Sequence, residues 1–221
     1  PGIVQIYEVG VDEGIPWMAL ELLEGETLAQ RLSGGPLSLE DAAWLIDAAL
    51  DLLVAVHGSG LVHRDIKPSN LFLEEDAAGN LRLRLLDFGV ALTTAEDGKL
   101  TRTGQALGTP WYMSPEQMRM KRNETIDARS DIYSMGVVFY ECLSGQLPFT
   151  GDSAADLAVQ IFTEAPVPLA GVAPTAPASL VQMVERCLAR DRQDRPANAE
   201  ALRDEFEAMD LDTPAATAPT A

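Results

Sequence analysis

Four polar side chains in the middle of the sequence have types and spacings that suit phosphate chemistry. Asp65 is followed closely by Lys67 and Asn70, and Asp87 opens an Asp-Phe-Gly triplet further along. A carboxylate such as Asp65 can orient an attacking hydroxyl and accept its proton, while Lys67 can place a positive charge on a phosphate. The oxygens of Asn70 and Asp87 are hard ligands that suit Mg²⁺. Each residue alone is a weak signal, but the set fits phosphoryl transfer from a magnesium-bound nucleotide.

Three further motifs follow these residues in chain order. They lie at residues 108–116 (GTPWYMSPE), 131–136 (DIYSMG) and 194–196 (DRP). With the segments at 63–70 and 87–89, they resemble the signature set of the protein kinase family in order and spacing. The resemblance covers residues 60–196 most closely. One departure is Ser114, which stands where many kinases carry Ala.

The resemblance implies a serine/threonine protein kinase that transfers the γ-phosphate of ATP to protein hydroxyls with the help of Mg²⁺ or Mn²⁺. Asp65, Lys67 and Asn70 would be the catalytic residues. Asn70 and Asp87 would bind the metal, and with Lys67 they would contact the nucleotide. Lys67 after the catalytic Asp is typical of Ser/Thr kinases rather than tyrosine kinases. Thr109 matches the Thr that hydrogen-bonds the catalytic Asp and Lys in that class.

Further motif residues are assigned structural roles by the same resemblance. They are His63, Phe88, Gly89, Glu116, Asp131 and Arg195. His63 would be a packing and hydrogen-bonding residue, and Asp131 would cap backbone amides of the catalytic loop. Glu116 and Arg195 would form a buried ion pair.

The front of the chain resembles the strand and hinge that hold adenine in kinases, over residues 17–28. Leu20 takes the gatekeeper position, and backbone groups of Glu21 and Leu23 would face the purine. Phe72 would form the floor beneath the adenine ring.

Regulation by phosphorylation is a hypothesis that rests on three residues. Arg64 precedes the catalytic Asp, as in kinases that are activated by loop phosphorylation, and Thr101 and Thr103 lie in a polar segment at residues 93–108. A phosphate there could pair with Arg64 and order the segment. The expected partners are proteins that carry Ser or Thr, and a second copy of the chain for trans-autophosphorylation.

The net charge of −18 argues against a nucleic-acid partner, because phosphate backbones are bound by clustered Lys and Arg. No stretch approaches the ~18 unbroken apolar residues of a membrane span. Cys142 and Cys187 are expected as buried free thiols of a reducing cytosol, and Trp17, Trp44 and Trp111 as core or loop anchors. The expected location is cytoplasmic, or the cytosolic domain of a single-pass receptor kinase.

Apolar periodicity predicts an α+β protein: a strand pair followed by a mostly helical body. The predicted segments are strands at 3–9 and 16–22, a short helix near residue 27, a helix led by Ser38, a hairpin turned at 78–80, and helices at about 128–144, 153–162, 178–189 and 197–209. In kinase terms this is the helical C-lobe with the hinge and the last two strands of the N-lobe sheet. The expected domains are residues 1–22 as an N-lobe remnant, 23–209 as hinge and C-lobe, and 210–221 as a disordered Thr/Pro/Ala-rich linker.

Two readings of function remain open at this point. The chain contains no Gly-x-Gly-x-x-Gly segment and no Val-Ala-x-Lys strand, which would be expected upstream of residue 1. The first reading is an active kinase whose 221-residue piece is weakly active or inactive by itself. The alternative is a pseudokinase or scaffold that binds partners without phosphoryl transfer, although such proteins usually lose residues of the Asp65 or Asp87 type.

Overall fold

The computed structural model describes residues 2–76, 78–86, 110–119 and 126–211, and has the α+β class that the sequence predicts. The strands are β1 (Ile6–Asp12), β2 (Ile15–Leu20), β3 (Gly25–Thr27), β4 (Leu71–Glu75) and β5 (Leu81–Leu85). The α-helices are α1 (Leu28–Leu32), α2 (Leu39–Gly58), α3 (Pro115–Arg119), α4 (Ala128–Ser144), α5 (Ala154–Thr163), α6 (Leu169–Val172), α7 (Ala178–Cys187) and α8 (Ala199–Glu207). Short 3₁₀ turns are η1 (Pro68–Asn70), η4 (Pro110–Tyr112) and η5 (Arg192–Asp194).

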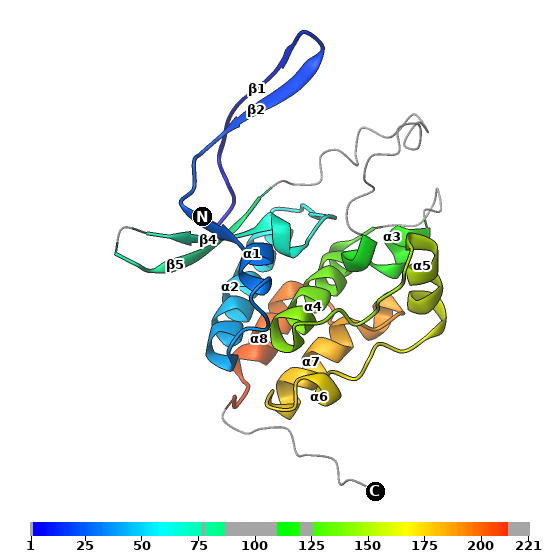
Figure 1. Ribbon diagram of the computed structural model, residues 1–221. Helices are drawn as coiled ribbons and strands as arrows, with labels where there is room; N and C mark the ends of the chain where they lie inside the picture. The colour runs from blue at the N-terminus through cyan, green and yellow to red at the C-terminus, as the bar shows by residue number, and fades with distance from the viewer. Residues whose placement is uncertain (1, 77, 87–109, 120–125, 212–221) are drawn as a thin grey trace, which may run out of the picture.

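Strands β1 and β2 form an antiparallel hairpin that projects away from the helical body (Figure 1). Its turn uses Glu13 and Gly14, both at positive φ, which matches the right-handed twist of the strands. Trp17, expected as a core or loop anchor, lies against Gly10 on this hairpin and is 42% exposed, so it is not part of the core. The first strand begins at Ile6 rather than residue 3, because residues 2–4 hydrogen-bond to β5 instead.

A second sheet, in the order β3-β4-β5, lies between the hairpin and the helices (Figure 1). Alternate residues of β4 and β5 are buried: Leu71, Leu73, Leu83 and Leu85. Since side chains alternate along a strand, the residues between them face the opposite side. Strand β3 was not predicted. The strand is three residues long and approaches β4 so closely that a Cβ on Gly25 would lie 2.0 Å from the Leu73 carbonyl oxygen.

The ends of the helices are set by capping residues. Ser38 Oγ accepts from the Asp41 N–H at 3.1 Å and starts α2, and Gly145 in a left-handed conformation ends α4. Helix α4 is the centre of the core: residues 130–140 are all buried, and it packs against α2 and α7. The core therefore surrounds one helix.

The longer predicted helices agree with the structure. The bounds of α4 are as predicted, and those of α5, α7 and α8 differ by at most two residues. The short helices α3 and α6 were not predicted, because a single turn carries no measurable periodicity. Cys142 and Cys187 are buried free thiols, as expected, and burial raises the pKa of Cys187 to about 12.

Within the described ranges, none of the helices combines the length and apolar character needed to span a bilayer. The predicted loop at 93–108 lies outside the described residues.

Helices α4 and α7 touch at Gly136, and this contact can be tested. A Cβ on Gly136 would lie 2.6 Å from Cys187 Cβ, so we expect Gly136→Ala to lower the free energy of unfolding by about 1–3 kcal/mol. Gly58→Ala is the matched control, because nothing lies within 4 Å of the added methyl at that helical position. The control should be neutral or stabilise by up to ~1 kcal/mol. Urea unfolding followed by circular dichroism measures both, and equal midpoints would contradict the close contact.

Candidate active site

The loop between α2 and β4 brings Asp65, Lys67 and Asn70 together. Lys67 Nζ donates to Asp65 Oδ2 at 2.7 Å, and Asn70 Nδ2 donates to the same oxygen at 3.0 Å. Asn70 Nδ2 also donates to the Asp65 carbonyl oxygen at 2.8 Å, which closes the loop on itself. The two side-chain contacts fix the Asp65 carboxylate through Oδ2 and leave Oδ1 outside these bonds. In the kinase reading of the sequence, Oδ1 would be the oxygen that accepts a proton from an incoming hydroxyl.

The backbone just before Asp65 is held by a buried carboxylate. Asp131 of α4 accepts from the N–H groups of His63 and Arg64, both at 2.8 Å, as the sequence predicts. Arg64 has a φ of 68°, which is unfavourable for a residue with a side chain. Gln117 Nε2 donates to the Arg64 carbonyl oxygen at 2.7 Å and holds this conformation from the other side. The strained turn is thus stabilised by contacts from α3 and α4.

His57 is a residue that sequence analysis missed. Its Nε2 lies 3.0 Å from Asp131 Oδ2, so three groups surround the Asp131 carboxylate, whose side chain is 1% exposed. His57 lies in the last turn of α2 and is 74 residues away from Asp131 in sequence. No local pattern could have indicated this pair.

His63 connects the loop to the end of β5. Its Nδ1 lies 3.3 Å from the Asp65 N–H and acts as acceptor, so Nε2 carries the proton and donates to the Leu86 carbonyl oxygen, also at 3.3 Å. The Leu86 N–H donates to the Asn70 carbonyl oxygen at 2.8 Å. The role expected for His63, packing and hydrogen bonding, agrees with these contacts.

Several predicted residues lie outside the described part of the chain. They are Asp87, Phe88, Gly89, Thr101, Thr103 and Thr109. Leu86, the residue before Asp87, is bonded to both His63 and Asn70.

Among the described residues, Asn70 is the predicted ligand that could bind a divalent metal. Both hydrogen bonds of the Asn70 side chain use Nδ2, so its Oδ1 points the other way and is the hard oxygen that could coordinate Mg²⁺. Within the described residues, no three His, Cys, Asp or Glu side chains gather in a metal-binding arrangement. The second predicted ligand, Asp87, is not among them.

The predicted purine contacts lie where β2 ends and the chain crosses to β3. The Glu21 N–H donates to the Gln5 carbonyl oxygen at 3.0 Å, so a purine contact from Glu21 would use its carbonyl group. Phe72 is half-buried on β4 and faces Thr27 of β3 across the sheet. Glu21 and Leu23 thus lie between β2 and β3, and Phe72 lies on β4, the strand that pairs with β3.

Glu116 and Arg195 form the predicted buried ion pair. Arg195 Nη1 and Nη2 donate to the two Glu116 oxygens at 2.7 and 2.9 Å, and Ser130 Oγ adds a bond of 2.7 Å. The Arg195 guanidinium also lies over the Tyr133 ring, 4.8 Å from its centre. Burial alone would raise the pKa of Glu116, but the hydrogen bonds and charge of Arg195, with Ser130, lower it to about 2. The pair ties α3 to the core beside α4.

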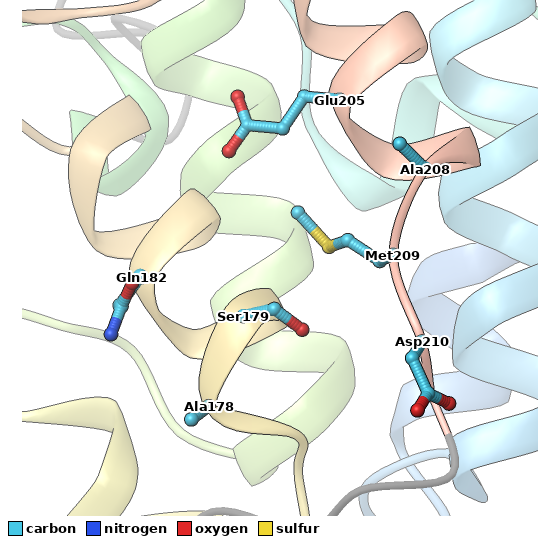
Figure 2. Close-up of a pocket in the computed structure, with 7 residues that line it drawn as sticks. All are labelled: Ala178, Ser179, Gln182, Glu205, Ala208, Met209 and Asp210. Atoms are coloured by element: carbon cyan, nitrogen blue, oxygen red, sulfur yellow. The ribbon is translucent and has the colours of Figure 1, made fainter.

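A hollow of about 410 Å³ lies between α7 and the end of α8 (Figure 2). It is lined by Ala178, Ser179, Gln182, Glu205, Ala208, Met209 and Asp210. Met209 reaches into the space, and the Glu205 carboxylate already pairs with Arg186. None of the predicted site residues lines it, so the hollow is separate from the candidate active site.

The chain is similar in sequence to one protein family and to several of its named members. The family model for the protein kinase domain matches residues 1–207 of this chain. The chain is 38% identical to serine/threonine-protein kinase pkn2 of Myxococcus xanthus, over 92% of this chain and 25% of that protein. It is 39% identical to PknL and 35% identical to PknB, both serine/threonine-protein kinases of Mycobacterium tuberculosis, covering 94% and 92% of this chain. It spans 50% of PknL and 32% of PknB, so it corresponds to half or less of each of these relatives.

The Glu116–Arg195 pair gives a prediction for stability and its pH dependence. Arg195→Met leaves a buried carboxylate without its cation, and we expect unfolding free energy at pH 7 to fall by about 3–5 kcal/mol. Arg186→Met, which breaks the more exposed pair with Glu205, is the control and should lower the free energy of unfolding by less than ~1 kcal/mol.

The folded pKa of Glu116, about 2, lies below its ordinary 4.5, so the stabilisation by the ion pair is lost as pH falls from 4.5 towards 2. Urea unfolding at several pH values should show a shallower decline in that window for Glu116→Gln. Parallel pH profiles for Glu116→Gln and the unmodified chain would contradict the assignment.

Proposed function

The chain belongs to the protein kinase family, and on that premise we propose that it transfers the γ-phosphate of ATP to Ser and Thr hydroxyls of proteins. The observation that supports this most directly is the convergence of Lys67 Nζ and Asn70 Nδ2 on Asp65 Oδ2. The relatives named serine/threonine-protein kinases support the same reaction class.

In the proposed reaction each residue has a separate task. Asp65 orients the substrate hydroxyl and accepts its proton through Oδ1, as the hydroxyl oxygen bonds to the γ-phosphorus and the bond to ADP breaks. Lys67 stabilises negative charge that develops on the transferred group. Asn70 and Asp87 would hold a divalent metal, which neutralises phosphate charge when it is bound. The hydrogen bonds of Asn70 also keep Asp65 in place.

The preference for Ser and Thr hydroxyls rests on sequence. Lys67, two residues after Asp65, and Thr109 match the Ser/Thr form of the family. In the structure the Lys67 side chain is 16% exposed and bonded to Asp65, which supports a role at the reaction centre rather than on the solvated surface.

The alternative function is a pseudokinase or scaffold. Asp65, Lys67 and Asn70 are all present and in contact, and Asp87 is present in the sequence, which favours the enzyme. The 221 residues contain no Gly-x-Gly-x-x-Gly segment, so we propose that this chain alone turns over slowly. Transfer of radiolabelled phosphate, measured for this chain and for a longer form that carries a glycine-rich loop with its Lys and Glu pair, separates the two functions.

Asp65→Asn tests the catalytic assignment in that assay. It keeps the size of the side chain but cannot accept the proton, so we expect kcat to fall by about 10²–10⁴-fold with little change in nucleotide affinity. Asp47→Asn, an exposed residue of α2, is the matched control and should leave kcat unchanged. Equal kcat for Asp65→Asn and Asp47→Asn would reject the role of Asp65, and robust autophosphorylation by the 221-residue chain would reject slow turnover.

We further propose that phosphorylation of Thr101 and Thr103, by a second copy of the chain, activates the enzyme. Arg64 supports this, because its Nε is buried and has no hydrogen-bond partner among the described residues. A phosphate could supply the missing acceptor.

Thr101→Ala/Thr103→Ala should therefore lower the rate of substrate phosphorylation by roughly tenfold or more. Thr93→Ala/Thr94→Ala, two positions in the same segment, is the control and should leave the rate unchanged. Mass spectrometry of the active enzyme should find phosphate at Thr101 or Thr103. Unchanged activity of the first double variant would reject the proposal.

A further inference from the structure

A single guanidinium, that of Arg84 on β5, joins three segments that are far apart in sequence. Arg84 Nη1 donates to Glu74 Oε2 of β4 at 3.0 Å. Its Nη2 donates to the Glu21 carboxylate and, at 3.3 Å, to the Ile3 carbonyl oxygen. The three side chains are 15–22% exposed, so these bonds are shielded from most of the solvent. Partly buried, charge-assisted bonds of this kind hold geometry better than exposed pairs.

Glu21 is fixed by its backbone as well as by its side chain. Its Oε1 accepts from the Gln5 N–H at 2.8 Å, and its own N–H donates to the Gln5 carbonyl oxygen at 3.0 Å. Residues 2–4 in turn run beside β5, where the Leu85 N–H donates to Gly2 and the Val4 N–H donates to Leu85. The start of the chain and the end of β2 are therefore anchored together on β5.

Arg84 also shares a face of the sheet with Phe72. The two residues are directly opposite in the β4–β5 ladder, so their side chains project to the same side. Their neighbours Leu71, Leu83 and Leu85 are buried on the other side. The bond to Arg84 therefore sets the position of Glu21 relative to the face that carries Phe72.

We propose that Arg84 is a positioning residue for the nucleotide, acting through Glu21. The segment of Glu21 and Leu23 is expected to contact the purine edge, and Phe72 is expected to lie beneath the ring. The Arg84–Glu21 pair fixes the separation of these two surfaces. Without Arg84, two carboxylates, Glu21 and Glu74, would face each other and push the segment outward. This inference rests on the proposed function, because it assumes that the site binds ATP.

The test compares Arg84→Gln with Arg82→Gln. Arg82 lies on the same strand and the same face, but it is 65% exposed and its ion pair, with Asp76, spans 3.5 Å. Calorimetry with Mg-ADP should show Kd about tenfold higher for Arg84→Gln and unchanged for Arg82→Gln. The KM for ATP should rise in parallel, whereas kcat and the KM for the protein substrate should stay within about twofold.

Two further variants separate positioning from general stability. Glu21→Gln should raise Kd as Arg84→Gln does, and the double variant should raise it by less than the product of the two single effects. Arg84→Lys, which keeps the charge, should recover part of the affinity. Each variant's unfolding midpoint is measured as well, because a fold-stabilising role alone would shift the midpoint and leave Kd unchanged.

Hydrogen exchange of the free chain gives a readout that needs no nucleotide. The backbone amides of Leu22 and Leu23 should exchange faster in Arg84→Gln than in Arg82→Gln. Equal exchange in these variants, or equal Kd values when the unmodified chain binds Mg-ADP, would overturn the role of Arg84. An unmodified chain that binds no nucleotide while its exchange pattern follows the expectation would instead overturn the proposed function, and the nucleotide role of Arg84 with it.

Discussion

The arrangement of the candidate active site depends on one buried carboxylate, Asp131. It lies in the most buried helix of the molecule and is surrounded by His57 and by the N–H groups of His63 and Arg64. A buried charge is tolerated only when such partners surround it, because an unpaired one costs several kcal/mol. The loop before Asp65 therefore cannot move away without removing two of the three groups that surround that charge. The constraint also explains how Arg64 keeps a left-handed backbone conformation despite its side chain.

Helix α4 provides a second anchor one residue earlier. Ser130 donates to Glu116, which pairs with Arg195, so neighbouring residues of one helix hold both the loop that carries Asp65 and the segment that begins α3. Packing makes this possible: α4 is enclosed by α2 and α7 and has little freedom to rotate or slide. Substitutions in the apolar core around α4 should then change the site through these two anchors, even where they contact neither.

Sequence patterns gave the features that depend on local periodicity and capping. The bounds of α4 follow from its largely apolar sequence between Asp127 and Gly145, which cap it, and the start of α2 follows from Ser38 and Asp41. Strand β3 could not be found, because three residues carry no alternation and Gly25 is explained only by the approach of Leu73. The catalytic motif indicated Asp65, Lys67 and Asn70 as a group. The partners His57 with Asp131 and Glu21 with Arg84 are 74 and 63 residues apart, so only the fold brings them together.

Strand β5 links the two ends of the site. At its end, Leu86 accepts from His63 and donates to Asn70, next to the residues expected to handle phosphate. Two residues earlier, Arg84 holds Glu21, next to the residues expected to hold the purine. Two residues of a strand span about 7 Å, so these attachments are separated by a fixed length of extended backbone. A register slip of one residue would place Arg84 in the apolar core and Leu85 outside it, which the burial of Leu83 and Leu85 strongly disfavours. The apolar face of β5 thereby sets the spacing of polar groups on which both ends of the site depend.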